Sequence, residues 1–198
     1  MNERLDDALV EDGAIALRYA KESDLEAYLA YLSDEEMNRL TGSQQPFTRE
    51  RIEAWLRTIG TESEERADWV IEHRETGELL GEVVLNEIDP INRSANIRIG
   101  IQGNRHRGQG YGTKAMIHML RHGFETRGLH RIHLGVYAFN PRAIRVYEKI
   151  GFKREGVERD ALYMDGRYHD MITMSMLEDE FRAIYGRTER TDDRFNRE

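Results

Sequence analysis

Hydrophobic and polar residues alternate most regularly over residues 94–102, where alanine and isoleucine occupy every second position and polar or small residues occupy the others. A period of two predicts a β-strand with one buried face. Further strands are predicted at residues 14–19, 68–73, 79–88, 131–137, 152–163 and 168–177. The last two flank Met164-Asp165-Gly166-Arg167, a segment typical of a hairpin turn.

Apolar residues at helical spacing predict helices between these strands. In residues 113–127 they form one face against charged positions, and Asn140-Pro141 is a typical helix start because asparagine caps free amides and proline tolerates the first helical position. Ser23 and Ser33 each precede a glutamate by three residues, as in a capping box. The predicted helices cover residues 24–32, 34–40, 48–58, 113–127, 140–150 and 178–185.

These elements predict one domain over residues 14–186, within the size range that folds around a single core. Residues 1–13 are polar and are expected to form an irregular N-terminal extension. Residues 187–198 contain one large apolar residue and are expected to be disordered or to contact another copy in a homo-oligomer. A strand, a helix and a strand over residues 94–137 predict a right-handed parallel crossover, so the fold class is α/β or α+β around a mixed sheet.

Composition excludes several function classes. The net charge of -8 argues against a nucleic-acid partner and suits a cationic one. No apolar run reaches the roughly 18 residues of a membrane span, and the acidic first residues do not resemble a signal peptide, so we expect a cytoplasmic protein with no membrane partner. The absence of cysteine excludes a disulfide, a cysteine nucleophile and a thiolate zinc site.

A glycine-rich stretch, residues 102–113, connects a predicted strand to a predicted helix. Glycine lets the backbone approach a ligand closely, and the start of a helix carries unpaired N–H groups and partial positive charge, so this stretch predicts an anion site. It lacks the lysine of a P-loop, and Gly108, Gly110 and Gly112 do not have the spacing of a dinucleotide-binding fingerprint. A loop with incidental glycines is the other interpretation.

Asn140 and Tyr147 lie seven residues apart and therefore share one face of a predicted helix. Ala143 and Ile144 lie on that face too, so it must point inward. A tyrosine in such a place is ordinarily part of the core. Here the helix follows the strand that should pair beside the glycine-rich stretch, so both polar side chains are candidates to reach a ligand between the strands.

Two motifs resemble the GNAT N-acetyltransferase superfamily. Residues 107–112 resemble its acyl-CoA pyrophosphate motif, R/Q-x-x-G-x-G/A, for which Arg105-x-x-Gly108-x-Gly110 is another register. Residues 140–152 resemble its N-x-x-A-x-x-x-Y-x-K-x-G-F block. The likeness covers about residues 14–177 and is closest to the branch of ribosomal-protein-alanine and spermidine acetyltransferases. It implies a mixed, mostly antiparallel sheet with a splayed parallel pair and flanking helices.

The resemblance implies an enzyme that moves acetyl from acetyl-CoA to a primary amine of a polyamine, another small cationic amine or a protein N-terminus. Tyr147 would protonate the departing CoA thiolate, and Asn140 would hold the pantetheine arm. Backbone groups near Ile101 would polarise the thioester. The residues expected to bind the cofactor are Gly100, Ile101, Gln102, Arg105, Arg107, Gly108, Gln109, Gly110, Tyr111, Gly112, Thr113, Asn140, Arg142 and Tyr147.

Acetylation also requires a base, because an amine with a pKa of roughly 10 is protonated at neutral pH. Glu82 and Glu87 have opposite parity on one predicted strand, so at most one faces the site, and Glu82 is the candidate. The resemblance places Asp34, Glu35 and Glu36 in a substrate-binding loop. Without a cysteine, direct attack of the amine on the thioester is expected.

Two alternatives remain at this stage. A non-catalytic acyl-CoA binding or sensing module would keep the glycine-rich stretch without needing Tyr147, and a nucleotide-binding protein is a third reading. His118 and His122 have the spacing of metal ligands on a helix, but the sequence offers no third ligand, so they are expected to be solvated and no metal is expected.

Overall fold

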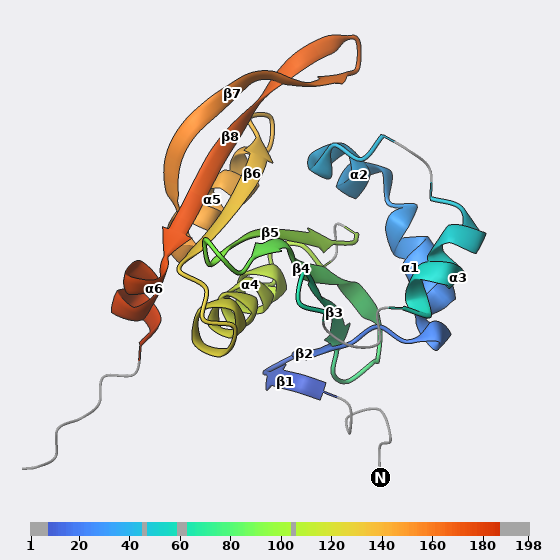
Figure 1. The fold of residues 1–198 in the computed structure, drawn as a ribbon. Helices are drawn as coiled ribbons and strands as arrows, with labels where there is room; N and C mark the ends of the chain where they lie inside the picture. Colours follow the sequence, from blue (N-terminus) through green and yellow to red (C-terminus); the bar gives the residue numbers. More distant parts are fainter. Residues whose placement is uncertain (1–7, 45–46, 59–62, 104–105, 187–198) are drawn as a thin grey trace, which may run out of the picture.

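The computed structural model describes residues 8–44, 47–58, 63–103 and 106–186, which build one eight-stranded sheet (Figure 1). Its strand order is β1-β2-β3-β4-β5-β6-β8-β7, and every neighbouring pair is antiparallel except β5 and β6. The mostly antiparallel mixed sheet is confirmed. The strands are β1 Ala8–Asp12, β2 Ile15–Arg18, β3 Ala67–His73, β4 Leu79–Asp89, β5 Ser94–Ile101, β6 Arg131–Tyr137, β7 Lys153–Met164 and β8 Arg167–Leu177.

Helices cover both faces of the sheet. The described residues contain the α-helices α1 Leu25–Leu32, α2 Glu35–Thr41, α3 Arg49–Leu56, α4 Tyr111–Arg121, α5 Pro141–Ile150 and α6 Glu178–Tyr185. A 3-10 turn, Glu22–Asp24, precedes α1, and a π-helical turn, His122–Thr126, extends α4. Figure 1 shows α1, α2 and α3 together beside the central strands, with the β7–β8 hairpin extending from the body. None of the helices in the described ranges is long and apolar enough to cross a membrane.

Alternation along the strands divides the core into two clusters. On β3, Trp69 and Ile71 pack in the larger cluster with α4, whereas Val70 between them packs under α1 and α3. On β5, Ile97 faces the larger cluster, so the next residue, Arg98, faces the side where α2 lies. This parity decides which residues of β4 and β5 reach the functional site.

The prediction that residues 1–13 are irregular is wrong for residues 8–12, which form β1 against β2. The strand was missed because it is short and lies at the sheet edge, where none of its residues is fully buried and the apolar Leu9 is exposed. Asp12 at its end accepts hydrogen bonds from Lys114 (2.7 Å) and His118 (3.0 Å) of α4. His118 is therefore bound within the protein. Residues 1–7 and the predicted tail, 187–198, lie outside the described residues.

Neither Ser23 nor Ser33 caps a helix as the sequence pattern predicts. Asp34, not Ser33, caps α2 and accepts the Met37 N–H at 2.9 Å. Near α1, it is Asp24 rather than Ser23 that accepts the backbone N–H of Lys21. Asp24 is also drawn into a buried ion pair with Arg18 at 2.8 Å. Burial and pairing thus override the capping-box pattern at both positions.

The parallel strands β5 and β6 separate soon after they meet. Their pairing includes only Ser94 with Arg131, Ala95 with Ile132 and Asn96 with His133. Beyond Asn96 both strands continue through described residues without pairing to one another, so they diverge as a wedge. The β5 backbone groups that point into this wedge are open to a ligand, because no neighbouring strand uses them.

Candidate active site

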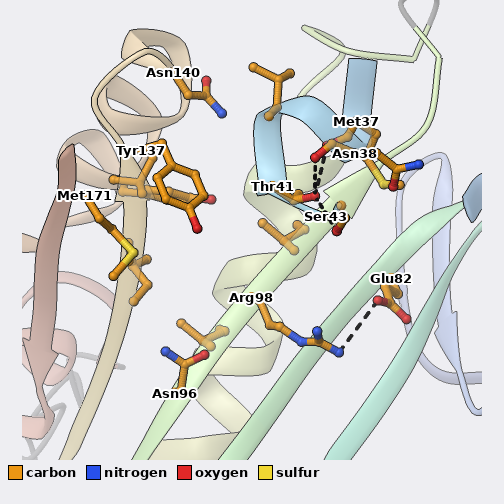
Figure 2. A pocket seen from close by; sticks show the side chains of 18 of the residues that line it. Met37, Asn38, Thr41, Ser43, Glu82, Asn96, Arg98, Tyr137, Asn140 and Met171 are labelled. Atoms are coloured by element: carbon orange, nitrogen blue, oxygen red, sulfur yellow. Dashed lines mark hydrogen bonds and ion pairs between the residues drawn. The ribbon is translucent and has the colours of Figure 1, made fainter. Parts of the chain in front are cut away.

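Two cavities open where β5 and β6 separate. The first, here the sheet cavity, has a volume of about 360 Å³ and lies between α2 and strands β4, β5 and β6 (Figure 2). The second, the glycine-loop cavity, has a volume of about 370 Å³ and is bounded by residues 106–113, α4 and α5. The residues that line both cavities are Met37, Leu40, Thr41, Ile99, Gly100, Asn140 and Tyr147. Ligands in the two cavities would therefore meet beside Gly100 and Tyr147.

The glycine-loop cavity has the electrostatics of a phosphate site. Four basic residues line it, His106, Arg107, Arg142 and Lys149, and none of its described lining residues is acidic. Helix α4 begins at this cavity, so its N-terminal N–H groups and dipole add partial positive charge. The residues present fit the anionic phosphates of CoA.

Most of the predicted cofactor residues lie together in this cavity. Gln102 and Gln109 are not part of its lining, and the Gln102 side chain instead donates to the Leu79 carbonyl oxygen at 2.5 Å. Arg105 lies outside the described residues. The predicted residues that do line the cavity are Gly100, Ile101, Arg107, Gly108, Gly110, Tyr111, Gly112, Thr113, Asn140, Arg142 and Tyr147.

Arg107 is not simply a cation directed at the cofactor. Its guanidinium lies 3.1 Å from Asp34 and 2.7 Å from Glu36, and it donates to the Ile101 carbonyl oxygen at 3.2 Å. These contacts tie the glycine-rich loop to α2 and to the end of β5. Two carboxylates offset much of its charge, so Arg142 and Lys149 are the more available cations.

The predicted substrate-loop carboxylates lie away from the sheet cavity, since neither Asp34, Glu35 nor Glu36 lines it. Asp34 also accepts the Gly103 N–H at 2.6 Å. Burial acts to raise the pKa of Asp34, but hydrogen bonds from the Gly103 and Met37 N–H groups outweigh it and hold this pKa below the ordinary value. Asp34 therefore stays ionised and organises the loop.

Gly110 permits a direct test of the glycine-loop cavity. It has a positive φ of 85°, and a Cβ added there would meet no atom within 4 Å, so that carbon would project into open space at the cavity wall. We expect Gly110→Ala to weaken CoA binding about tenfold, measured by calorimetry. Gly128→Ala is the matched control, because Gly128 also has a positive φ and open space but does not line either cavity. Equal CoA affinity in the two variants would contradict this site.

Asn140 and Tyr147 project from α5 toward the wedge. The Asn140 side-chain oxygen caps the helix by accepting the Ala143 N–H at 3.1 Å, which leaves the amide N–H₂ group as its donor toward a ligand. Burial raises the pKa of Tyr147 to about 12. The phenol therefore remains protonated throughout the neutral range, as a general acid must.

Gly100 lines both cavities, and because it has no side chain its backbone is accessible where the cavities meet. A Cβ at this position would lie 2.1 Å from the Tyr31 hydroxyl oxygen, so a larger residue does not fit without displacing α1. Its partner on β4 is Glu82, which lines the sheet cavity, whereas Glu87 is exposed and does not. Of the two glutamates, Glu82 alone therefore lines the sheet cavity, as their opposite parity predicts.

Glu82 has the environment of a candidate base. Its side chain is 16% exposed, accepts a hydrogen bond from Tyr28 at 2.5 Å and lies 3.9 Å from Arg98. Burial raises the pKa of Glu82, and this effect prevails over the opposing influences of the Arg98 charge and the Tyr28 hydrogen bond. A higher pKa makes the ionised carboxylate a stronger base.

Sequence reasoning did not single out several residues that line the sheet cavity. Arg98 and Asn96 occupy the polar face of the regularly alternating strand, the face that also carries Gly100, so their parity was an available signal. Tyr137 and Met171 approach the cavity from β6 and β8, and no local pattern indicates that they face it (Figure 2).

His118 and His122, which were expected to be solvated, each contact another residue of the protein. His118 binds Asp12, and the His122 ring packs against Trp69 with 4.8 Å between centroids. Both side chains are engaged within the protein rather than solvated. Across the described ranges, no three acidic or histidine side chains are grouped so as to hold a metal ion.

Comparison with known proteins places this architecture in a family. The acetyltransferase (GNAT) domain model matches residues 15–153. An uncharacterised N-acetyltransferase of Bacillus subtilis is 28% identical over 171 residues, covering 85% of this chain and 96% of that protein. A spermidine N(1)-acetyltransferase of Vibrio cholerae is 36% identical over 103 residues, covering 52% of this chain and 59% of that protein.

Solved structures agree with the sequence relatives. The spermidine N-acetyltransferase from Vibrio cholerae, in complex with CoA and spermine, superposes with a TM-score of 0.78 at 26% identity, covering 86% of this chain and 99% of the other. The overall fold is therefore shared with this acetyltransferase over most of both chains. The chain belongs to the GNAT acetyltransferase family and is an acetyl-CoA-dependent N-acetyltransferase that acts on an amine.

Proposed function

We propose that acetyl-CoA binds in the glycine-loop cavity and that the acceptor is a small primary amine bound in the sheet cavity. The observation that carries this proposal is the junction of the two cavities at Gly100, Asn140 and Tyr147. There a thioester entering from one side and an amine entering from the other would come within reacting distance. A volume of about 360 Å³ suits a small molecule.

The proposed reaction is a direct transfer. Glu82, or a water molecule that it holds, takes a proton from the ammonium of the acceptor, and the amine nitrogen attacks the thioester carbonyl carbon. The new C–N bond forms as the C–S bond breaks, and the Tyr147 hydroxyl donates its proton to the departing sulfur. The nitrogen then loses its second proton, which returns to the tyrosinate directly or through water, so the product is a neutral amide and Tyr147 is protonated again. Backbone N–H groups on the free edge of β5 stabilise the negative charge that develops on the carbonyl oxygen.

Each proposed role is supported by a different property. Tyr147 lines both cavities and keeps its proton, and Glu82 lines only the sheet cavity and has a raised pKa. The proposed acid, Tyr147, therefore borders the cofactor cavity, where the thiolate leaves. The proposed base, Glu82, borders the acceptor cavity, where the amine loses its proton. Because the chain has no cysteine, attack on the bound thioester needs no cysteine acyl-enzyme.

The names of the relatives make spermidine a natural first acceptor to test. A protein N-terminus, the cytoplasmic location and a homo-oligomer stay predictions. The acceptor experiment measures CoA thiol release from acetyl-CoA with a panel of spermidine, amino acids, simple primary amines and a short peptide, and confirms the acetylated product by mass spectrometry. We expect turnover with at least one small amine. Thiol release that no amine raises above the acetyl-CoA-only background would overturn the proposal.

A further inference from the structure

The charges of the sheet cavity limit which amine it suits. Among the described residues that line it, Glu82 is the one carboxylate and Arg98 is the one cation. The other polar lining residues are uncharged. An acceptor with several ammonium groups would find one carboxylate here and a guanidinium beside it, so its second positive charge would be opposed rather than neutralised.

Nearby carboxylates do not change this balance. Asp34 and Glu36 bind Arg107, and Asp165 at the tip of the β7–β8 hairpin lies 3.2 Å from Arg39. None of these three acidic residues lines the sheet cavity. These three carboxylates are thus paired with arginines outside the lining of the cavity.

Arg98 is available to bind an anion. It lies on β5, two residues before Gly100, and its side chain is 52% exposed. Its ion pair with Glu82 spans 3.9 Å, which is too long for a hydrogen bond, so this pair does not use the guanidinium donors. Figure 2 shows the Arg98 side chain extending toward Glu82 beneath Thr41 and Ser43 of the α2 region.

We propose that Arg98 binds a carboxylate of the acceptor and that the acceptor is an α-amino acid, with its amine beside Glu82. An α-amino acid carries its ammonium and carboxylate on one carbon, and Glu82 and Arg98 present the opposite charges side by side. The planar guanidinium matches a carboxylate through two parallel hydrogen bonds. This inference rests on the proposed function and narrows its substrate class.

The lining of the cavity indicates the side chain of that amino acid. Tyr137 and Met171 lie across the cavity from Arg98 and Glu82, and Phe47 adds another apolar surface to the lining (Figure 2). Aromatic rings and a thioether form favourable contacts with apolar or aromatic groups. An amino acid with an aromatic or large aliphatic side chain therefore fits the cavity best.

The experiment compares acceptors that share a side chain and differ in the carboxylate. These are phenylalanine, phenylalaninamide and phenethylamine, with leucine and isoamylamine as a second set and spermidine as the polyamine. For the wild-type enzyme we expect kcat/KM for the free amino acid to exceed that for its amide and its decarboxylated amine at least tenfold. Phenylalaninamide also stands for a peptide N-terminus, because its α-amine has no free carboxylate beside it.

The variant Arg98→Gln isolates the proposed contact. We expect it to erase the preference for the free amino acid in both sets, chiefly by raising KM, while Arg98→Lys retains part of the preference through its charge. The readout is the ratio between acceptors, since a change in the Glu82 pKa affects all acceptors alike. Arg39→Gln is the control, because Arg39 is a cation of α2 outside the cavity lining.

The possible outcomes separate this inference from the proposed function. A wild-type preference for spermidine or for the decarboxylated amines, or an Arg98→Gln ratio equal to the wild-type ratio, overturns the Arg98 assignment and leaves acetyl transfer intact. Thiol release with none of the amines overturns the proposed function itself. A preference for the free amino acid that disappears in Arg98→Gln, in a protein whose thermal unfolding matches wild type, supports both.

Discussion

Tyr147→Phe is expected to lower kcat roughly a hundredfold while leaving the affinity for CoA nearly unchanged. The change removes the one hydroxyl of α5 that lines both cavities and retains the ring that fills the space. Since burial raises the Tyr147 pKa to about 12, the wild-type hydroxyl still carries its proton when the thiolate departs. Steady-state kinetics with the best acceptor, together with CoA calorimetry, measures both quantities.

Tyr185→Phe is the control for this loss. Its hydroxyl donates to the Ile150 carbonyl oxygen at 3.0 Å, at the end of α5. Tyr185 lines neither cavity, so Tyr185→Phe removes a partly buried hydrogen bond and leaves the proposed catalytic groups in place. It should keep kcat within about twofold. If Tyr147→Phe also kept wild-type kcat, another group would have to protonate the leaving sulfur.

Glu82→Gln is expected to lower kcat/KM at neutral pH by roughly a hundredfold and to change the shape of the pH profile. The base works only when ionised, and burial raises the Glu82 pKa. Wild-type activity should therefore fall as pH decreases through a value above the usual glutamate pKa of about 4.3. In Glu82→Gln the decrease in rate that reflects the Glu82 pKa should disappear, and the pH dependence should follow only the deprotonation of the acceptor amine.

Glu87→Gln provides the matched control, because Glu87 lies on the same strand but is exposed and outside the sheet cavity. It should keep the wild-type profile. A Glu82→Gln profile that coincides with wild type would assign amine deprotonation to another group or to solvent. A low rate at every pH with weakened acceptor binding would instead assign Glu82 to binding alone.

Local patterns predicted most elements because they reflect burial directly. The alternation along β5, the Asn140-Pro141 start of α5 and its Gly151 end correspond closely to the structure. β1 escaped prediction because an edge strand buries only one side of a short segment. The serine caps were wrong because Asp34 caps α2 instead and Asp24 before α1 is engaged with Arg18, contacts that a local pattern does not reveal.

The site was predictable on its cofactor side and less so on its acceptor side. The glycine-rich loop and the α5 motif are each a continuous segment, so their resemblance to known motifs predicted that Gly110, Asn140 and Tyr147 bind one cofactor, and all three line one cavity. The acceptor cavity instead combines residues from α2, β4, β5, β6 and β8, elements far apart in the sequence that only the folded sheet brings together. For this reason no local pattern indicated Arg98, whereas the resemblance assigned Asp34, Glu35 and Glu36 to the substrate.

Residues 107–112 thus do more than offer backbone to an anion. Arg107 forms ion pairs with Asp34 and Glu36, which connect the loop to α2, the helix that lines both cavities. Met37, Leu40 and Thr41 of α2 line both cavities, so these ion pairs connect the glycine-rich loop to a helix that borders the two cavities. We propose that CoA and the acceptor react where the two cavities join.

A crystal structure of the protein with CoA tests this claim most directly. We predict that the pyrophosphate lies against Gly108, Gly110 and the start of α4, and that the pantetheine arm follows the free edge of β5. The thiol should lie beside Gly100, within hydrogen-bonding reach of the Tyr147 hydroxyl or one water molecule away. A CoA molecule bound with its thiol outside the wedge between β5 and β6, remote from Tyr147, would contradict the account.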